Sequence, residues 1–349
     1  MNDASAPVDR PCAAMVLAAG FSSRMRPLSD QIPKPCLPVL GRPLIHYVFD
    51  WLAARGVREA GVNLHHLPRA VRAAVSGYAG PPIRFTLSEE AGLILLTAGA
   101  LAPLRELFRH GGTFILVNGK LVLDIDLGPV LDFHRRSGNV ATLVMRPNRA
   151  RDRFMHVDLG PEGEIRGYVA FDEARGRIPE LVTFTGIHLI EPGALDAIPD
   201  GQPFDTVKDL YPLLQARGER VRGFLAEGEW REFSTPRRYL DHSLAMLRER
   251  GLKNWTTWRL ELHGAARAEA AVFGEQVEVE AGAVLRRSLL LGDNRVGRGA
   301  RLTDCIVGPG ADIPAGSRFE QSVIVRADSL TSPCPGCRPE GDLAIAPLA

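Results

Sequence analysis

The sequence predicts an α/β domain with a mostly parallel sheet, followed by a β-helix of hexapeptide repeats. Two observations support this prediction. Short apolar segments alternate with helical segments over about 130 residues, which is typical of a parallel sheet covered by helices on both faces. In the last quarter of the chain, large apolar residues return every five or six residues with glycines between them, which is typical of a β-helix.

The α/β part is predicted from the spacing of its apolar residues. Four apolar runs have strand character: 14–19, 59–65, 114–119 and 140–146. Five segments have helical spacing: 43–56, 67–78, 128–138, 206–217 and 236–250. After Pro147 the pattern loosens into strands and loops until the helical spacing returns. Strands and helices that alternate in this way indicate a sheet built from βαβ units.

The β-helix is predicted from ten apolar positions near the end of the chain. Seven of the nine steps between them are six residues long and two are five: Phe273, Val279, Leu285, Leu291, Val296, Leu302, Val307, Ile313, Phe319 and Val325. A meander of short strands would not keep this period for so long. Each rung of the helix is therefore expected to bury one large side chain.

These patterns divide the chain into four parts. Residues 1–11 are polar and are expected to be a disordered tail. Residues 12–250 form the α/β domain, whose last helix ends at Gly251. Residues 251–330 form the β-helix, and residues 331–349, which are rich in proline and glycine, are expected to be an irregular tail.

Composition argues against several classes of protein. A net charge of +1 gives no case for a nucleic-acid partner, which needs a basic face. No apolar run approaches the roughly 20 residues of a membrane span, and the first residues lack the features of a signal peptide. Five cysteines, three of them isolated, favour a reducing cytoplasm. Cys334 and Cys337 lack both the further ligands of a zinc site and the βαβ context of a redox motif.

A loop after the first predicted strand concentrates cations and small residues. The strand runs into Gly20, and the loop that follows contains Ser22, Ser23, Arg24, Arg26 and Lys34. Small residues let backbone N–H groups approach an anion, and three cations supply the charge that a triphosphate requires. The glycine spacings of the P-loop and of the dinucleotide fingerprint are absent. A basic surface loop stiffened by prolines is the alternative interpretation.

The specific string in this loop favours the phosphate-binding interpretation. "LAAGFSSRMRPLSDQIPKPCLPVLGRPLI" (17–45) resembles the opening signature of sugar-1-phosphate nucleotidylyltransferases. Further landmarks follow in the family's order: "VNLHHLP" (62–68), "TAGAL" (97–101), "VNG" (117–119), "FTGIHLIEP" (184–192) and "STPRRYL" (234–240). The resemblance spans residues 14 to about 245 and is most similar to mannose-1-phosphate guanylyltransferases. It implies a Rossmann-like sheet domain, and many members carry a left-handed β-helix behind it.

The resemblance also implies a reaction and a site. A sugar 1-phosphate would attack the α-phosphorus of a nucleoside triphosphate (NTP), giving a nucleoside diphosphate-sugar (NDP-sugar) and pyrophosphate. Arg24 would hold the leaving phosphates and Lys34 the reacting phosphates. Gly186 would allow close approach of the sugar. The nucleotide would be bound by Leu17, Ala18, Ala19, Gly20, Ser22, Ser23, Thr97, Ala98, Gly99, Asn118 and Gly119.

The sequence departs from the family pattern where the metal is expected. The family has Val-Asn-Gly-Asp at 117–120, and that aspartate binds Mg²⁺, but this chain has Lys120. The second metal carboxylate of the family's Trp-x-Asp-x-Gly-Thr corresponds to Glu232 in "WREFSTP". Asp124 could lie on the order of 13 Å from the lost ligand along an extended strand, too far to replace it. Mg²⁺ is therefore expected from the family but in doubt from these residues.

Other departures fall on the same pocket. Leu96 replaces the first glycine of Gly-Thr-x-Gly, and Ser22 replaces a glycine of the first loop. "FMHV" (154–157) stands where a Tyr-Gly pair usually faces the sugar, and the Glu-Lys-Pro motif is absent. Lys120 could replace the charge of an aspartate with its bound Mg²⁺, but it could not bridge two phosphates.

Several interpretations therefore stay open. The chain is an altered enzyme, or a nucleotide-sugar-binding pseudoenzyme or regulatory subunit of an active paralogue. In a third interpretation, Lys120 is an exposed loop residue without chemical consequence. A cytidylyltransferase also begins like "LAAGFSSRM" (17–25), but Pro-Lys-Pro and the hexapeptide repeats disfavour it. The base, the sugar and the oligomeric state, whether homo-oligomer or hetero-oligomer with a paralogue, are not determined by the sequence.

Overall fold

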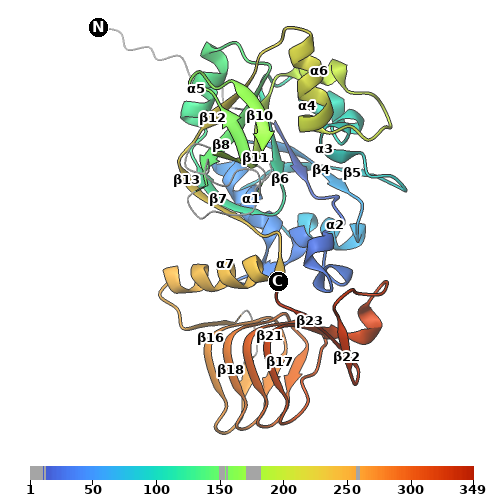
Figure 1. The fold of residues 1–349 in the computed structure, drawn as a ribbon, viewed down its shortest axis with the longest axis vertical. Coiled ribbons are helices and arrows are strands. Elements are labelled where there is room, and N and C mark those ends of the chain that lie inside the picture. The colour runs from blue at the N-terminus through green and yellow to red at the C-terminus, as the bar shows by residue number, and fades with distance from the viewer. Residues whose placement is uncertain (1–10, 12, 149–153, 155, 170–181, 257–259) are drawn as a thin grey trace. The chain divides into compact units, whose positions relative to one another are not determined.

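The computed structural model describes residues 11, 13–148, 154, 156–169, 182–256 and 260–349 (Figure 1). The expected disordered tail at 1–11 lies almost wholly outside these residues. The chain forms two compact units. The first contains Met1–Gly20, Tyr47–Pro68 and Val75–Trp230, and the second contains Phe21–His46, Arg69–Ala74 and Arg231–Ala349. The cation-rich loop after Gly20 thus belongs with the β-helix, across the boundary expected from the sequence.

The first unit is built on a sheet that contains nine of the described strands (Figure 1). Along the sheet the order is β10-β9-β11-β6-β1-β4-β5, and β8 pairs with both β11 and β12. The strands are β1 (Ala13–Leu17), β4 (Glu59–Leu64), β5 (Arg84–Glu89), β6 (Phe114–Asn118), β8 (Ala141–Pro147), β9 (His156–Leu159), β10 (Ile165–Val169), β11 (Val182–Ile190) and β12 (Val221–Leu225). β6, β1, β4 and β5 are mutually parallel, and β11 runs antiparallel to β6. The predicted α/β fold is confirmed.

Helices and short strands complete this unit. The helices include most of α1 (Leu44–Ala54), and also α3 (Leu96–Gly99), α4 (Arg105–Arg109), α5 (Gly128–Arg136) and α6 (Tyr211–Ala216). Most of α2 (Pro68–Ser76) belongs to the second unit. A π-helical turn (Thr206–Leu210) leads into α6, and β7 (Leu121–Ile125) pairs with β13 (Gly228–Glu232). Met15, Leu116 and Leu143 are fully buried in the core beside the sheet. The nearly continuous burial of β1 and β6 follows from their apolar sequences, because parallel strands in such sheets are covered on both faces.

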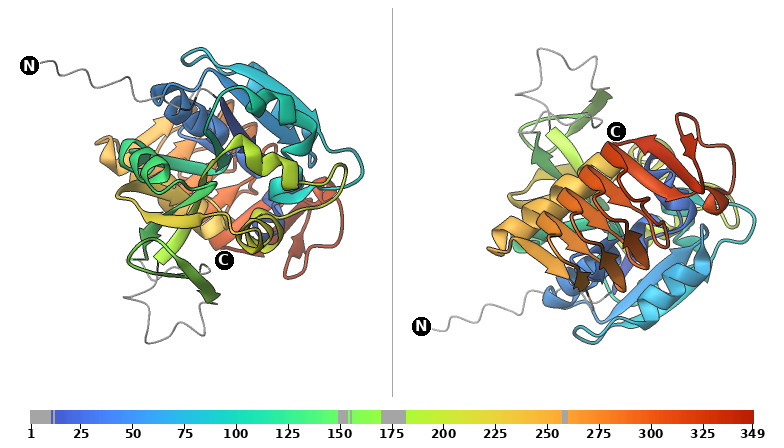
Figure 2. Two further views of the ribbon diagram at one scale, coloured as in Figure 1. Left: turned by 90° about the horizontal axis from the view of Figure 1, so that it is seen from above. Right: turned by 90° about the horizontal axis from the view of Figure 1, so that it is seen from below.

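The second unit contains the β-helix (Figure 2). One parallel sheet consists of β14 (Asn254–Thr256), β16 (Arg267–Phe273), β18 (Val284–Leu290), β20 (Arg301–Val307) and β21 (Arg318–Arg326). A second contains β15 (Leu260–Leu262), β17 (Val277–Val279) and β19 (Asn294–Val296). Leu285 pairs with Leu302 and Leu302 with Phe319, so each coil advances 17 residues (302 − 285, 319 − 302). The predicted hexapeptide β-helix is confirmed, and a coil of 17 residues agrees with the mixture of steps of six and five residues in the sequence.

A helix and a hairpin cover parts of the β-helix. α7 (Pro236–Glu249) lies along β16, β18 and β20 (Figure 1), and its first turn is capped by Thr235, which accepts from Arg238 N–H. The expected irregular tail differs from the structure at residues 338–347. There β22 (Arg338–Glu340) and β23 (Leu343–Pro347) form a hairpin, and β23 pairs antiparallel with β21. The hairpin closes an edge that would otherwise expose unpaired backbone groups.

Candidate functional site

The carboxyl ends of β1 and β6 lie side by side in the first unit. Leu17 is the register partner of Asn118, and Gly119 N–H donates to Leu17 O at 2.9 Å. Open α/β sheets bind ligands at the carboxyl ends of their parallel strands. Four of the predicted nucleotide residues, Leu17, Ala18, Asn118 and Gly119, are therefore brought together by the sheet itself.

Gly186 lies against the same strand end. Its φ is +81°, a left-handed conformation that favours glycine. A Cβ atom built on Gly186 would lie 2.0 Å from Asn118 Nδ2. The close approach of β11 to Asn118 thus requires a glycine, and it places the predicted sugar residue beside the predicted nucleotide residues.

The predicted nucleotide residues Thr97, Ala98 and Gly99 form the short helix α3. Ala98 N–H and Gly99 N–H both donate to Phe204 O at 2.9 Å. Thr97 Oγ1 lies 3.0 Å from Asp205 Oδ2 and accepts from Thr206 N–H at 2.7 Å. These bonds tie α3 to residues 204–206. The amides of Ala98 and Gly99 are therefore engaged inside the protein.

Two buried polar side chains connect these segments, and the sequence interpretation missed them. Asn63, at the end of β4, accepts from Ala18 N–H at 2.7 Å and donates to Glu90 Oε1 at 2.7 Å. Glu90 Oε2 accepts from Leu95 N–H at 2.8 Å, just before α3. Asn63 is 3% and Glu90 4% exposed. An asparagine inside an otherwise apolar strand was the available signal.

Leu96 is unusual in this region. Its φ is +63° although it is not a glycine, and 43% of the residue is exposed. A left-handed conformation costs a side chain with a Cβ atom about 1 kcal/mol. The family's glycine would adopt this conformation without that penalty, so the replacement by leucine carries a local conformational cost at the candidate site.

The second unit holds the cation-rich loop. Ser22 has φ +57°, and its carbonyl accepts from Met25 N–H at 2.7 Å. The resulting turn, η1 (Ser23–Met25), leaves Ser23 and Arg24 exposed. Burial raises the pKa of the nearby Cys36 thiol to about 12, so this cysteine is not a thiolate near neutral pH. Arg24 is thus the exposed cation that the loop offers.

Arg26 is used for structure. Its guanidinium contacts both carboxylate oxygens of Asp30, with the shortest bond at 2.9 Å. It also donates to Ser332 O at 2.6 Å and to Pro333 O at 3.2 Å. Thr331 Oγ1 adds a bond to Asp30 at 3.1 Å. Arg26 therefore fastens the loop to the segment that leads into the Cys334–Cys337 disulfide.

The predicted catalytic Lys34 and the predicted metal ligand Glu232 are both buried in this unit. Lys34 is 6% exposed, and its ammonium lies 3.5 Å from Ser234 O. Glu232 is 5% exposed, with a carboxylate oxygen 3.9 Å from Arg238 Nη1. Lys34 and the segment around Glu232 thus share a buried polar region next to Ser234.

Lys120 lies partly exposed in the turn between β6 and β7. The two carboxylates that follow it have other partners. Asp124 pairs with Arg55 at 3.2 Å, and Asp126 accepts from Gly128 N–H at 2.9 Å. Among the described residues, no group of three or more His, Cys, Asp and Glu side chains is arranged to hold a metal. A lysine with these neighbours does not form the carboxylate set that Mg²⁺ prefers.

The remaining sequence departures are placed only in part. Phe154 packs edge-to-face on Trp230, with ring centroids 5.3 Å apart, and Arg146 lies over the same indole at 5.1 Å. The Glu-Lys-Pro motif is absent from residues 165–180, of which 165–169 form β10 and 170–180 lie outside the described residues.

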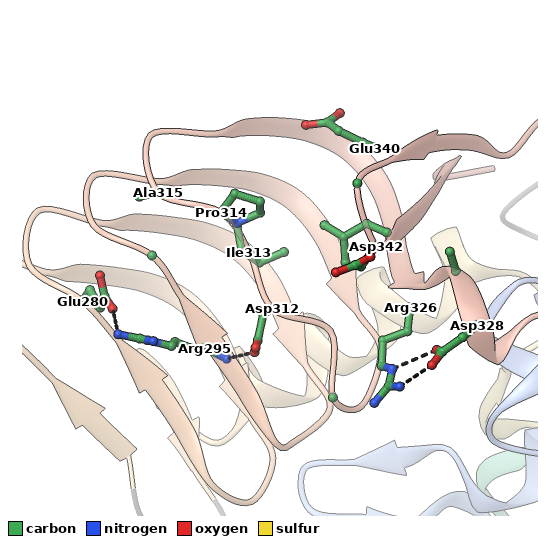
Figure 3. A pocket seen from close by; sticks show the side chains of 15 residues that line it. Glu280, Arg295, Asp312, Ile313, Pro314, Ala315, Arg326, Asp328, Glu340 and Asp342 are labelled. Carbon is green, nitrogen blue, oxygen red and sulfur yellow. Dashed lines mark hydrogen bonds and ion pairs between the residues drawn. The ribbon is translucent and has the colours of Figure 1, made fainter.

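A cavity of about 910 Å³ lies in the second unit, between the β-helix and the β22–β23 hairpin (Figure 3). Several of its charged groups are paired with one another. Arg295 bonds to Glu280, its backbone N–H donates to Asp312, and Arg326 forms a two-pronged pair with Asp328. These pairs stabilise the turns of the coil, and none of the predicted site residues lines the cavity.

Comparison with known proteins agrees with this architecture. A model of the nucleotidyl transferase family matches residues 13–249, and a model of the GlmU-like C-terminal hexapeptide region matches residues 262–322. A mannose-1-phosphate guanylyltransferase of Mycobacterium tuberculosis is 28% identical over 321 residues, which cover 88% of this chain and 83% of the relative. A UTP–glucose-1-phosphate uridylyltransferase of Synechocystis is 26% identical over 84% of this chain and 86% of the relative. The mannose-1-phosphate guanylyltransferase 1 of Arabidopsis thaliana is 24% identical, over 90% and 91%. Within the described residues, no helix has the length and apolar character needed to cross a membrane.

Proposed function

We propose that this chain, which belongs to the nucleotidyl transferase family, transfers a nucleoside monophosphate from an NTP to a sugar 1-phosphate, giving an NDP-sugar and pyrophosphate. The observation that supports this best is the meeting of Leu17, Asn118 and Gly186 at one strand end, because open α/β sheets bind ligands at the carboxyl ends of their parallel strands. Relatives named for mannose 1-phosphate and for glucose 1-phosphate both match. GTP with mannose 1-phosphate is the first pair to test, and UTP with glucose 1-phosphate is the second.

The proposed roles come from the family resemblance and agree with the charge of these residues. The exposed Arg24 would neutralise the departing pyrophosphate, and Ser22 and Ser23 would keep the loop backbone close to the phosphates. Lys34, held beside Ser234, would face the reacting phosphates. Such a reaction asks the protein for positioning and for charge neutralisation more than for covalent chemistry.

Lys120 would replace part of the charge that the family's metal supplies. An ammonium group neutralises one phosphate oxygen, but it does not bridge two phosphates in octahedral geometry. Loss of that bridge should slow transfer by several powers of ten relative to an enzyme with an intact metal site.

Pyrophosphate release tests the proposal. The natural protein, Lys120→Asp and the control Lys253→Asp, an exposed lysine in the second unit, are incubated with each NTP and sugar 1-phosphate, with Mg²⁺ and with EDTA. We expect slow release by the natural protein with one pair and faster, Mg²⁺-dependent release by Lys120→Asp. Lys253→Asp should match the natural protein. Absence of release from every protein with every pair would contradict the enzyme proposal.

A second candidate is a nucleotide-sugar-binding pseudoenzyme or a regulatory subunit of an active paralogue. It is favoured by Lys120 together with the engagement of Asp124 and Asp126 by other groups. Calorimetry with NTPs and NDP-sugars distinguishes the two: micromolar binding without pyrophosphate release supports the pseudoenzyme. Assembly with a paralogue and a cytoplasmic location stay predictions.

A further inference from the structure

Asn63 and Glu90 form a relay between two segments of the candidate nucleotide site. The relay runs from Ala18 N–H to Asn63, from Asn63 to Glu90, and from Glu90 to Leu95 N–H, with distances of 2.7, 2.7 and 2.8 Å. We infer that Asn63 and Glu90 are positioning residues that hold the loop after β1 and the α3 turn at one fixed separation for the nucleotide. This inference rests on the proposed function for its ligand.

The direction of every bond in the relay is set by its ends. Ala18 and Leu95 both contribute backbone N–H donors, so the Asn63 oxygen and one Glu90 oxygen must accept. The Asn63 amide nitrogen is then the donor to the other Glu90 oxygen. Both side chains are more than nine-tenths buried. A buried polar group that loses its partner is costly, so the relay is not interchangeable with apolar packing.

The turn that the relay holds contains the strained Leu96. Leu95 N–H is fixed by Glu90, and Leu95 O accepts from Phe204 N–H at 3.0 Å. Leu96 then takes φ +63° with its side chain 43% exposed. Strained residues persist where their surroundings over-determine them, and they cluster at ligand sites. The relay supplies that constraint from the side of the sheet, and residues 204–206 supply it from the other side of α3.

An exchange of the two side-chain types tests the relay. Glu90→Gln alone presents an amide nitrogen to the Asn63 amide nitrogen, or leaves Leu95 N–H without its acceptor. Asn63→Asp alone sets two carboxylates against each other. The double variant Asn63→Asp/Glu90→Gln restores every donor and acceptor with the same shapes and the same total charge: Asp accepts from Ala18 N–H and from the new amide, and Gln accepts from Leu95 N–H.

The measurements are the dissociation constants of GTP and UTP by calorimetry and the unfolding temperature. We expect each single variant to weaken nucleotide binding by about tenfold or more and the double variant to return to within about threefold of the natural protein. Asn139→Asp serves as the control, because Asn139 is a buried asparagine that bonds to Thr142 away from these strand ends. It should lower the unfolding temperature and leave both dissociation constants unchanged.

The outcomes separate this inference from the proposed function. Single variants that lower the unfolding temperature but keep nucleotide affinity would overturn the positioning role. A folded double variant whose nucleotide binding stays weak would overturn it too. This measurement decides the question even if a single variant does not fold. Natural protein that binds nucleotide without pyrophosphate release would contradict the enzyme while leaving the relay supported by the exchange. Natural protein that binds neither nucleotide would overturn both.

Discussion

The β-helix and the strand-end site both hold non-glycine residues in left-handed conformations, but they do so by different means. In the β-helix, Ala270, Arg287, Asp304 and Gln321 have φ values of 53°, 46°, 52° and 45° and recur at the 17-residue interval of the coil. Each of these residues lies within a strand, and the adjacent strand has the same conformation at the equivalent position. At the strand-end site, the residue before Leu96 is held by the buried carboxylate of Glu90, which lies just after β5. In the β-helix the left-handed conformation is repeated from coil to coil, whereas at the strand-end site it depends on single contacts.

This difference teaches where each region is vulnerable. A coil gains its stability from contacts with its neighbouring coils. The loss of stability on substitution should therefore depend on how much buried side-chain volume is removed. The strand-end site gains its geometry from a few directional hydrogen bonds. The effect of a substitution there should therefore depend on which donors and acceptors lose their partners. Three stability experiments can break or sharpen this comparison.

The largest effect is expected from the core of the coil. Leu302 is fully buried and stacked between Leu285 and Phe319 in neighbouring coils. Leu302→Ala should lower the free energy of unfolding by about 2–5 kcal/mol, because it removes buried area and leaves a cavity. Urea denaturation measures this. Leu262→Ala, at a position 46% exposed in β15, is the control and should cost far less. Equal losses would mean that packed volume does not dominate the coil.

A smaller effect is expected from the bond between the loop and the hairpin segment. Arg26→Gln removes the fork to Asp30, whose side chain is only 5% exposed. The buried carboxylate then lacks its cation, and we expect a loss of about 2 kcal/mol, reduced from the fully buried case because Arg26 is partly exposed. Faster proteolysis within 331–340 should accompany it.

The control for this substitution is a surface pair in the same unit. Arg237 lies 3.2 Å from Asp241 on α7, and both side chains are more than 40% exposed. Arg237→Gln should cost about 0.5 kcal/mol or less. A similar cost for both variants would show that Arg26 contributes no more than a surface pair.

The smallest effect should have opposite signs in the two regions. Leu96→Gly relieves a left-handed leucine and should raise the free energy of unfolding by about 0.5–1 kcal/mol. Arg287→Gly relieves the same kind of conformation but loses pairs to Asp304 at 2.7 Å and Asp241 at 3.1 Å, so it should lower stability. Thermal unfolding of both variants checks the signs. A stabilised Arg287→Gly would mean that the pairs do not compensate for the strain.

The fold could be predicted from the sequence where its signals are local. The period of the apolar residues anticipated both the parallel sheet and the coil, because each period depends only on neighbours within a few residues. The glycine at 186 was named from the resemblance, and its close approach to Asn118 gives the physical reason for it.

The missed features depend on contacts between distant residues. Asn63 and Glu90 are 27 residues apart and meet only because β4 and β5 are adjacent in the sheet. The hairpin at 338–347 needed the open edge of β21, which its own composition does not reveal. The engagement of Arg26 was hidden in the same way: a cation beside small residues looked suited to phosphate, but its acceptors lie at Ser332 and Pro333.

That last contact also orders events during synthesis. Arg26 and Ser332 are separated by 306 residues. At a translation rate of about 20 residues per second, roughly 15 s pass between the two leaving the peptidyl transferase centre. Throughout that interval the loop emerges without the carbonyls that Arg26 contacts in the native protein. One of the first segments to be synthesised therefore gains its native contacts only when one of the last segments has been made. A ribosome that stalls before Ser332 leaves Arg26 without those acceptors.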